Sequence, residues 1–304
     1  MSELRINSIT DKSGTSGPVI SGVTTNASSA CLIIPSGNTS NRVGVSTYIT
    51  QGTIPQTQAV RQFFDAGDIK SNNPADSTNI WRNLSADPDK TDIRFDRIGA
   101  FTRGTGATGF IDLAGNNHNA LICDSMSKDI FNNGGQGTIF LIFRADDVST
   151  RQTLVSGYNQ SSGENTDRWD FEISGGNIIG GNHQTDLYFY SGTTISADTY
   201  YTLAITLDKG DDRLVGITTT ENGSVLKYYI NGSLTDGWAY PDHHFDGLDS
   251  PVKISLGRRP GEAEAQNANF EYNGEFNVFI TYNVVLDADE VLELHNAFKD
   301  RFGL

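Results

Sequence analysis

The sequence has little cysteine and no long apolar run. Its two cysteines, Cys31 and Cys123, are too few and too far apart for a disulfide framework or a zinc site, so we expect two buried free thiols. No run approaches the roughly 18 apolar residues that a membrane-spanning helix needs. The first residues also lack the basic region and apolar core of a signal peptide. We therefore expect neither membrane insertion nor a secretion signal.

Basic residues are scarce relative to acidic ones. The chain has 22 Lys and Arg against 37 Asp and Glu, a formal net charge of −15. Such a surface repels phosphate backbones, which argues against a nucleic-acid partner. One interpretation is that the negative charge keeps the protein soluble or adapts it to salt. The other is that it attracts cations or a basic partner surface. Proline is sparse as well, at eight residues, and with 32 glycines and 10% aromatics the composition is typical of a turn-rich β protein.

The first 58 residues contain neither Trp nor Phe. Short β-like pieces (Leu4 to Ile9, Cys31 to Ile34, Val43 to Ile49) alternate there with Ser, Thr and Gly. Such a segment cannot bury much apolar area by itself. We predict that residues 1–58 form an extended arm that another chain orders; a flexible leader is the alternative.

The opening residues of this arm, MSELRINSITDKSGTSGP, resemble the leader of many virion structural proteins of marine tailed bacteriophages, above all cyanophages. Residues 34–42 (IPSGNTSNR) resemble a connector found in phage fibre proteins. The resemblance implies a protein that is made in the host cytoplasm and displayed on the virion. It also implies that Leu4, Ile6 and Ile9 attach the arm to other virion proteins, in a homo-oligomer for which a trimer is favoured.

From about residue 59 onward the chain reads as strand after strand. Thr138 to Arg144 is apolar at successive positions, as expected of a central strand covered on both faces. Tyr200 to Asp208 and Leu226 to Ser233 alternate, and Asn231-Gly232 favours a tight hairpin turn. Two further sets are predicted to point inward: Val252, Ile254 and Leu256, and then Phe276, Val278, Ile280 and Tyr282. Leu226, Tyr228 and Ile230 are also predicted to face inward, with Lys227 and Tyr229 outward.

One helix closes the chain. Asp287 and Glu290 have the spacing of a capping box. Val291, Leu294 and Phe298 then form the apolar stripe of a helix that lies on a sheet. Many strands with a single terminal helix predict an all-β fold, a two-sheet antiparallel sandwich with one C-terminal helix.

Several landmarks resemble the concanavalin A-like lectin/glucanase fold in its laminin G-like branch. They are residues 228–232 (YYING), 254–258 (ISLGR) and 273–290 (NGEFNVFITYNVVLDADE). Residues 64–67 (FDAG) and 81–84 (WRNL) resemble the opening of bacterial and phage members. The resemblance implies a jelly-roll sandwich over residues 59–304.

The sequence departs from this family at two places. Phe279 stands where the family has a small or acidic residue, and Gly274-Glu275-Phe276 replaces its Gly-x-Ile/Leu. Because the fold hosts hydrolases as well as lectins, catalysis has to be judged at the site.

Hydrolases of this fold resemble one another in a strand with the pattern E-x-D-x-(x)-E, and residues 169–174 (WDFEIS) come nearest to it. Asp170 and Glu172 would share one face, roughly 7 Å apart along the strand. The third carboxylate is replaced by Ser174, so we expect no glycoside hydrolysis, a reaction that needs paired carboxylates on opposite sides of the bond. The alternative for Asp170 and Glu172 is ordinary solvent-facing polar residues on a half-buried strand. No zinc-binding histidine spacing, nucleophile elbow or P-loop occurs, and we expect no enzyme.

No cofactor is required by any motif. The Asp- and Asn-rich stretches 208–212 and 242–249 could supply oxygen ligands to calcium. Asp-rich turns are common without an ion, so calcium remains an open alternative.

Sugar recognition needs aromatic faces that stack on the rings, next to polar groups that fix the hydroxyls. Residues 186–190 (DLYFY) and the predicted loop 236–244 (DGWAYPDHH) have this composition. The candidate glycan-binding residues are Tyr188, Tyr190, Trp238, Tyr240, His243, Asp170 and Glu172. Ordinary packing, including packing against another subunit, is the alternative for each.

These observations lead to one hypothesis and two alternatives. The chain is expected to be a phage virion structural protein, a fibre, spike or head or tail appendage, whose lectin-like domain adheres to host-surface glycan. The first alternative is an architectural capsid decoration or tail component that binds no sugar. A glycan depolymerase is the second.

Overall fold

The computed structural model describes residues 19–20, 23–26, 31–33, 54–68, 70–73, 80–85, 94–98, 101–104, 106–113, 119–123, 136–159, 168–182, 187–209, 224–240, 252–258 and 270–304. The chain divides into two compact units, Met1–Val43 and Gly44–Leu304. The boundary at residue 58 that the sequence suggests stays a prediction.

The first unit contains a three-stranded antiparallel sheet in the order β1-β2-β3. Its strands are short: β1 (Val19–Ile20), β2 (Val23–Asn26) and β3 (Cys31–Ile33). β3 confirms the strand predicted from Cys31 onward. Leu4, Ile6 and Ile9 lie outside the described residues, and so does the predicted strand from Val43 to Ile49.

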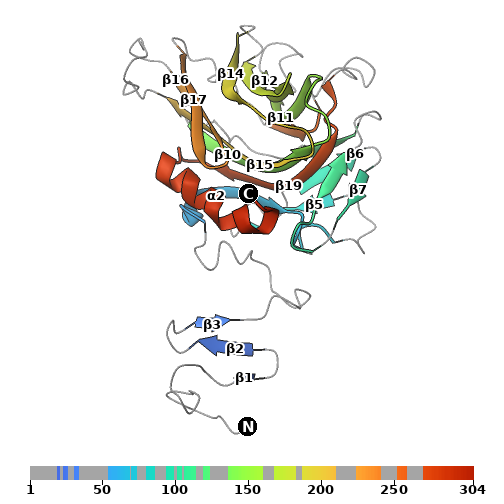
Figure 1. The fold of residues 1–304 in the computed structure, drawn as a ribbon, viewed down its shortest axis with the longest axis vertical. Helices are drawn as coiled ribbons and strands as arrows, with labels where there is room; N and C mark the ends of the chain where they lie inside the picture. The colour runs from blue at the N-terminus through green and yellow to red at the C-terminus, as the bar shows by residue number, and fades with distance from the viewer. Residues whose placement is uncertain are drawn as a thin grey trace. The chain divides into compact units, whose positions relative to one another are not determined.

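The second unit contains two antiparallel sheets of eight strands each (Figure 1). We call them the helix-side sheet and the distal sheet. The helix-side sheet has the order β17-β16-β15-β10-β19-β8-β7, with β4 pairing with β19, and the distal sheet has the order β14-β13-β12-β11-β18-β9-β6-β5. This architecture confirms the predicted two-sheet antiparallel sandwich with a C-terminal helix.

The strands of the helix-side sheet are β4 (Val60–Asp65), β7 (Phe101–Arg103), β8 (Ile111–Leu113), β10 (Gly137–Ala145), β15 (Tyr200–Lys209), β16 (Ser224–Ile230), β17 (Ser233–Tyr240) and β19 (Gly274–Tyr282). Those of the distal sheet are β5 (Ile80–Arg82), β6 (Arg94–Ile98), β9 (Ala120–Cys123), β11 (Gln152–Asn159), β12 (Arg168–Ser174), β13 (Asn177–Asn182), β14 (Leu187–Thr194) and β18 (Val252–Leu256). A short 3₁₀ helix, η2 (Thr57–Ala59), precedes β4. Cys123, in β9, is a buried free thiol, as predicted.

The helix α2 (Ala288–Phe302) covers one face of the helix-side sheet (Figure 1). Its capping box is formed as predicted: Glu290 N donates to Asp287 Oδ1, and Asp287 N donates to Glu290 Oε2. The predicted stripe of Val291, Leu294 and Phe298 is buried beneath it. Gly303 ends the helix at a φ of 70°, a left-handed conformation that glycine adopts without strain.

Two apolar cores result from this layering. One lies between the two sheets and contains Ile139 and Leu141 of β10, and the other lies between the helix-side sheet and α2 and contains Phe140 and Ile142 of the same strand. Successive residues of a strand point to opposite faces. β10 therefore contributes side chains to both cores, which explains why it is apolar at consecutive positions.

A β-bulge changes the predicted orientation of β19. Phe276, Val278, Ile280 and Tyr282 were expected on one face, but Phe276 lies in the core between the sheets and the other three lie beneath α2. The register shifts because Phe276 pairs with Phe143 and Val278 pairs with the adjacent Ile142, which leaves one residue of β19 extra. This residue is Asn277, whose buried side chain donates to the Gly109 carbonyl at 3.1 Å.

The hairpin between β16 and β17 follows the prediction. Asn231 and Gly232 have φ values of 51° and 74°, as a two-residue turn of the primed type requires. Tyr228 faces the core between the sheets. Tyr229 points the other way, as expected, but it is 3% exposed because it lies in the core beneath α2.

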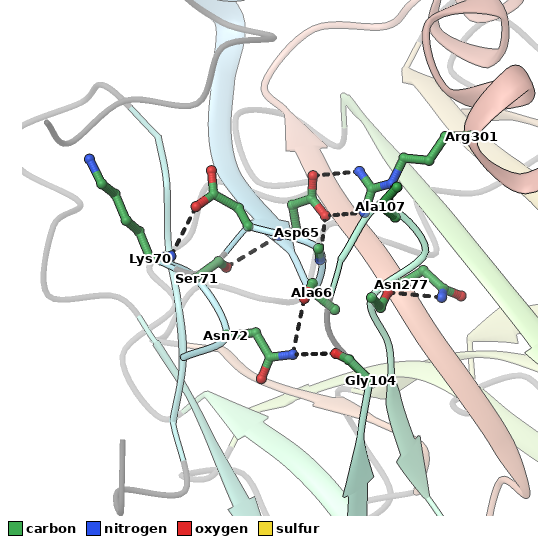
Figure 2. Close-up of polar contacts among 12 residues, drawn as sticks. Asp65, Ala66, Lys70, Ser71, Asn72, Gly104, Ala107, Asn277 and Arg301 are labelled. Atoms are coloured by element: carbon green, nitrogen blue, oxygen red, sulfur yellow. Dashed lines mark hydrogen bonds and ion pairs between the residues drawn. The ribbon is translucent and has the colours of Figure 1, made fainter. Parts of the chain in front are cut away.

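The end of β4 is tied to the end of α2 by a buried ion pair (Figure 2). Arg301 Nη1 and Nη2 donate to the two carboxylate oxygens of Asp65 at 2.7 and 2.6 Å, and Arg301 Nε donates to the Ala107 carbonyl. Asn72 bridges the same segment to the β7–β8 turn by donating to the carbonyls of Ala66 and Gly104. Asp65 belongs to the FDAG motif noted in the sequence, and its role here is to join three chain segments.

Candidate functional site

The structure places the two segments that carry the predicted aromatic clusters on neighbouring strands. Tyr188 and Tyr190 belong to β14, and Trp238 and Tyr240 belong to β17. β14 ends the distal sheet and β17 ends the helix-side sheet, and the two strands lie beside each other. We call this side of the sandwich the β14–β17 edge.

Part of this edge was predicted wrongly. Residues 236–244 were expected to form a loop, but Asp236 to Tyr240 complete the strand β17. They pair with β16, with Asp236 opposite Tyr228, Trp238 opposite Leu226 and Tyr240 opposite Ser224. The large residues Trp238 and Tyr240 alternate with the small residues Gly237 and Ala239, as a strand allows, but Gly237 and Pro241 favoured a loop. His243 lies outside the described residues.

Tyr190 is the most accessible of the candidate residues whose side chains are described. Its side chain is 53% exposed. It lies opposite Ile179 of β13, which in turn lies opposite Glu172 of β12. An exposed aromatic ring on an edge strand offers a face on which a flat apolar surface can stack. Tyr188 lies opposite Gly181, and Gly181 opposite Asp170.

The strand β14 is irregular just after Tyr190. The register with β13 shifts between Asn177 and Ile179. The Ser191 hydroxyl stabilises the irregularity, since it accepts from Ile178 N at 3.3 Å and donates to the Thr193 carbonyl at 3.0 Å. Gly192 follows at a φ of 68° and is exposed. This bulge places Gly192 next to β17, because a Cβ atom added there would lie 3.1 Å from Asp236 Oδ2.

Asp236 points from β17 toward this bulge. Residues that are directly opposite in an antiparallel pair share a face, and Asp236 is opposite Tyr228, which faces the core between the sheets. Gly237 N donates to Asp236 Oδ1 at 2.7 Å. The other carboxylate oxygen is the one beside Gly192. Sequence reasoning did not single out Asp236, because nothing in its local pattern tells which strand of the other sheet it will meet.

Asp170 and Glu172 share one face of β12, as predicted, but they are not solvent-facing. Asp170 is 1% exposed and Glu172 is 0% exposed. They lie on the face opposite Trp169, Phe171 and Ile173, which belong to the core between the sheets. The alternation of the strand correctly predicted that Asp170 and Glu172 point away from the core between the sheets. It could not tell that the second face is covered as well.

The two buried carboxylates are held by the neighbouring strand β11 and the turn before it. The Ser156 hydroxyl donates to Asp170 Oδ1. Glu172 accepts from Arg151 Nε at 2.6 Å and from the Thr153 hydroxyl at 3.2 Å. Arg151 also stacks on the Phe270 ring, with its guanidinium carbon 5.2 Å from the ring centroid. These contacts tie both carboxylates to the scaffold.

A second polar cluster, which the sequence did not reveal, lies on the helix-side sheet. Arg144 forms ion pairs with Asp146, Asp198 and Glu275 at 3.1, 2.7 and 2.9 Å. The Tyr200 hydroxyl donates to Glu275 Oε2 at 2.7 Å. Burial, and then this hydrogen bond, raise the pKa of Tyr200 to about 12, so the phenol stays protonated.

Asp112 lies directly opposite Glu275 on the neighbouring strand β8. Burial raises the pKa of Asp112, and repulsion by Asp146 and Glu275 raises it further, while Arg144 lowers it. Asp112, Asp146 and Glu275 thus form a charge network in which three carboxyl groups surround the guanidinium of Arg144. It joins strands β8, β10 and β19.

Neither a metal centre nor a membrane span is found among the described residues. Within those ranges no three His, Cys, Asp or Glu side chains come together as metal ligands. Of the stretches proposed for calcium, only residues 208–209 are described, and there Asp208 accepts from Gln136 Nε2 at 3.0 Å. No helix in the described part of the chain has the length and apolar character needed to cross a bilayer.

Comparison with known proteins finds similarity in structure alone. No protein-family model matches the chain, and no curated protein sequence does either. Similar solved structures include the botulinum neurotoxin type G receptor-binding domain, with a TM-score of 0.50 and 14% identity over 78% of this chain and 51% of that one. A receptor-binding domain matches with a TM-score of 0.56 and 12% identity over 83% and 53%. The binding domain of Paraclostridial Mosquitocidal Protein 1 matches with a TM-score of 0.53 and 16% identity over 80% and 53%.

This similarity concerns the fold. The chain spans about half the length of these structures, between 51% and 53%. At such low identity a shared architecture does not carry function with it. What it establishes is a β-sandwich of two antiparallel sheets.

Proposed function

We propose that this protein is a phage virion structural protein whose β-sandwich adheres to glycan on the host surface through the β14–β17 edge. The observation that carries the proposal is the exposed ring of Tyr190 on β14, an edge strand that lies beside the edge strand β17. Sugar rings present one apolar face and a rim of hydroxyls, and an exposed aromatic ring can stack on that apolar face.

Accessibility favours this edge over the face of β12. Asp170 and Glu172 are buried and hydrogen-bonded to neighbouring side chains, whereas Tyr190 and Gly192 are exposed. We therefore assign Asp170 and Glu172 a supporting role beneath the site. The candidates Tyr188, Trp238 and Tyr240 lie on the two strands that form the edge, and they remain part of the proposed site.

The virion setting rests on the leader MSELRINSITDKSGTSGP and its resemblance to phage structural proteins. In the proposal, residues 1–58 attach to other virion proteins through Leu4, Ile6 and Ile9. The protein would assemble as a homo-oligomer, with a trimer favoured, and the sandwich would face the host. No cofactor is required, and calcium in the Asp-rich stretches is an optional addition.

The test is binding of the full chain to host envelope polysaccharide. Tyr190→Ala should abolish binding without changing the melting temperature, because an exposed side chain contributes little to stability. Leu234→Ala is the matched control, since Leu234 is 54% exposed on the neighbouring strand β17 but is not aromatic. Tyr188→Ala and Trp238→Ala should also weaken binding. Binding by Tyr190→Ala at the wild-type level would contradict the proposed site.

An architectural role is the second candidate, and the exposed apolar residues near the edge support it. Leu234 is exposed on β17, and Leu292 of α2 is 44% exposed next to the β16–β17 turn, since a Cβ at Gly232 would lie 3.0 Å from Leu292 Cδ1. Such a surface could equally pack against another virion protein. No glycan binding, combined with loss of particle incorporation when residues 1–58 are removed, would favour this role.

Catalysis is not part of the proposal. Hydrolysis needs one carboxylic acid and one free carboxylate on either side of the bond, and the oxygens of Glu172 are bound by Arg151 and Thr153. Release of reducing sugar that depends on Asp170 or Glu172 would overturn this view and make the protein a depolymerase.

A further inference from the structure

The three-stranded sheet of the first unit has one face that is mainly aliphatic. Ile20 of β1 lies opposite Val23 of β2, and Thr25 of β2 lies opposite Leu32 of β3. Residues that are directly opposite share a face, and so do residues two apart in one strand. Ile20, Val23, Thr25 and Leu32 therefore lie on the same face, which we call the Ile20–Leu32 face.

The other face of this sheet is more polar at its centre. β2 is the middle strand, and it contributes Thr24 and Asn26 to that face. Val19 and Ile33 lie opposite Thr24, and Cys31 lies opposite Asn26. Apolar residues are thus confined to the two outer strands on this side. The Ile20–Leu32 face, with Val23 on the middle strand, is the better surface for apolar burial.

The first unit has little with which to cover this face by itself. Its strands have only two, four and three residues. Residues 1–43 contain no Phe, Trp, Tyr or His and a single cysteine, Cys31, while Cys123 of the second unit is a buried free thiol. A disulfide within the unit and a zinc site are therefore both excluded. Units of this size usually need a disulfide, a metal or association with another chain, and association is the one that remains.

The distribution of charge indicates the partner. Residues 1–43 have three basic and two acidic residues, whereas the whole chain has a formal net charge of −15. The second unit therefore carries the excess of acidic residues, and second units of different copies repel one another. First units can come together almost without such repulsion. They also offer little charge to attract a partner surface of either sign. A nearly neutral, aliphatic patch that every copy presents is suited to a self-complementary contact.

We propose that the Ile20–Leu32 face is a self-association surface and that its partner is the same face of another copy of this chain. Ile20, Val23 and Leu32 of each copy leave water in this contact, so the free energy of association also stabilises the small sheet. The inference rests on the proposed homo-oligomer and deepens it, because it names the surface that joins the copies.

The experiment measures the mass of the full chain in solution by sedimentation equilibrium over a range of protein concentrations. The wild type should be an oligomer. Val23→Asp places a charge without a partner in the contact and should weaken self-association at least about a hundredfold. Leu32→Asp, on a different strand but the same face, should have the same effect. Thr24→Asp is the matched control, since it adds the same charge to the same strand on the opposite face. It should associate as the wild type does.

The outcomes separate this inference from the proposed adhesion. A loss of association in Thr24→Asp as large as that in Val23→Asp would refute the assignment of the face. A wild type that is monomeric at every concentration yet binds host polysaccharide would refute self-association and leave adhesion standing; the partner of the first unit would then be a different protein. A wild type that associates as expected but binds no polysaccharide would leave this inference standing and refute adhesion.

Discussion

The central strands β10 and β12 of the two sheets are buried on both faces, but with different chemistry. The helix-side sheet has apolar residues on both faces of β10, one set against the distal sheet and the other against α2. The distal sheet has apolar residues on only one face of β12, and on the other it buries Asp170 and Glu172. Both arrangements exclude water, yet the first draws its stability from apolar burial and the second from hydrogen bonds and charge pairing.

This difference determines how each sheet responds to substitution. Removing an apolar group costs the transfer free energy of the lost atoms and the cavity that remains. Removing one member of a buried polar pair costs the desolvation of the partner left behind. The predictions below test both costs, from the largest effect to the smallest.

The largest loss is expected beneath α2. Phe298 is fully buried, with its ring centroid 6.5 Å from that of Phe63 and 5.8 Å from that of Phe140. Phe298→Ala should lower the free energy of unfolding by about 3–5 kcal/mol, measured by chemical denaturation. Leu292→Ala on the exposed side of the same helix is the control and should change it by less than about 0.5 kcal/mol. A loss in Phe298→Ala as small as that in Leu292→Ala would contradict the role of this packing in holding α2.

A smaller loss is expected on the polar face of the distal sheet. Glu172→Gln removes the charge that Arg151 Nε contacts at 2.6 Å, and should cost about 1–3 kcal/mol. The value lies below that of a fully buried pair because the Arg151 side chain is 31% exposed. In the double variant Glu172→Gln, Arg151→Met, part of the loss should be recovered. Full additivity of the two single changes would show that the pair is not coupled.

Acidification should weaken the contact between α2 and β15. His295 is buried, and its Nδ1 lies 2.9 Å from the Thr202 hydroxyl. Burial lowers the pKa of His295, and the Lys299 charge lowers it further. The unfolded state then takes up the proton more readily, so the stability from this group is complete above the ordinary pKa of about 6.5 and declines as the pH falls below it.

The measurement is the melting temperature between pH 7.5 and 5, compared with that of His295→Asn, which retains a polar group near Thr202. The wild type should lose more stability across this range than the variant. Parallel curves would mean that His295 does not contribute to the pH dependence. The effect should be smaller than that of Glu172→Gln.

The smallest effect is a gain. Asp112 and Glu275 lie directly opposite each other, and like charges in this position are destabilising. Asp112→Asn should raise the free energy of unfolding at pH 7 by a few tenths of a kcal/mol, about the lower end of cross-strand pair effects. Asp300→Asn, on the exposed surface of α2, serves as the control for removal of one negative charge. A loss of stability would indicate that Asp112 has a favourable role in the Arg144 network.

The apolar elements of the fold could be predicted from the sequence. The continuous apolar run of β10, the alternation of β15 and the capping box of α2 each correspond to a physical period or a local hydrogen bond. The bulge at Asn277 could not be predicted, because it depends on Gly109 and Ala66 approaching β19 from elsewhere in the chain. Alternation continued through the bulge therefore placed Phe276 on the wrong face.

The candidate site was predicted only in part. The sequence identified aromatic residues of two separate segments, and Tyr190 is exposed as that hypothesis needs. It could not reveal that β14 and β17 are neighbours, because they end different sheets and no local pattern specifies which edges meet. The position of Asp236 beside the β14 bulge was missed for that reason. Asp170 and Glu172 were misjudged as solvent-facing because alternation reports the direction of a side chain and not what covers it.

The position of β19 has a consequence for how the protein is made. This strand pairs with β10, β4 and β8 near the middle of the helix-side sheet, yet it and α2 follow every other described element along the chain. During synthesis, β10 and β15 emerge long before the strand that must lie beside β10. The ion pair between Asp65 and Arg301, 236 residues apart, forms later still. The nascent sandwich therefore carries an open sheet edge from the synthesis of β10 until that of β19, which makes this interval the one in which chaperones or sister chains have access to it.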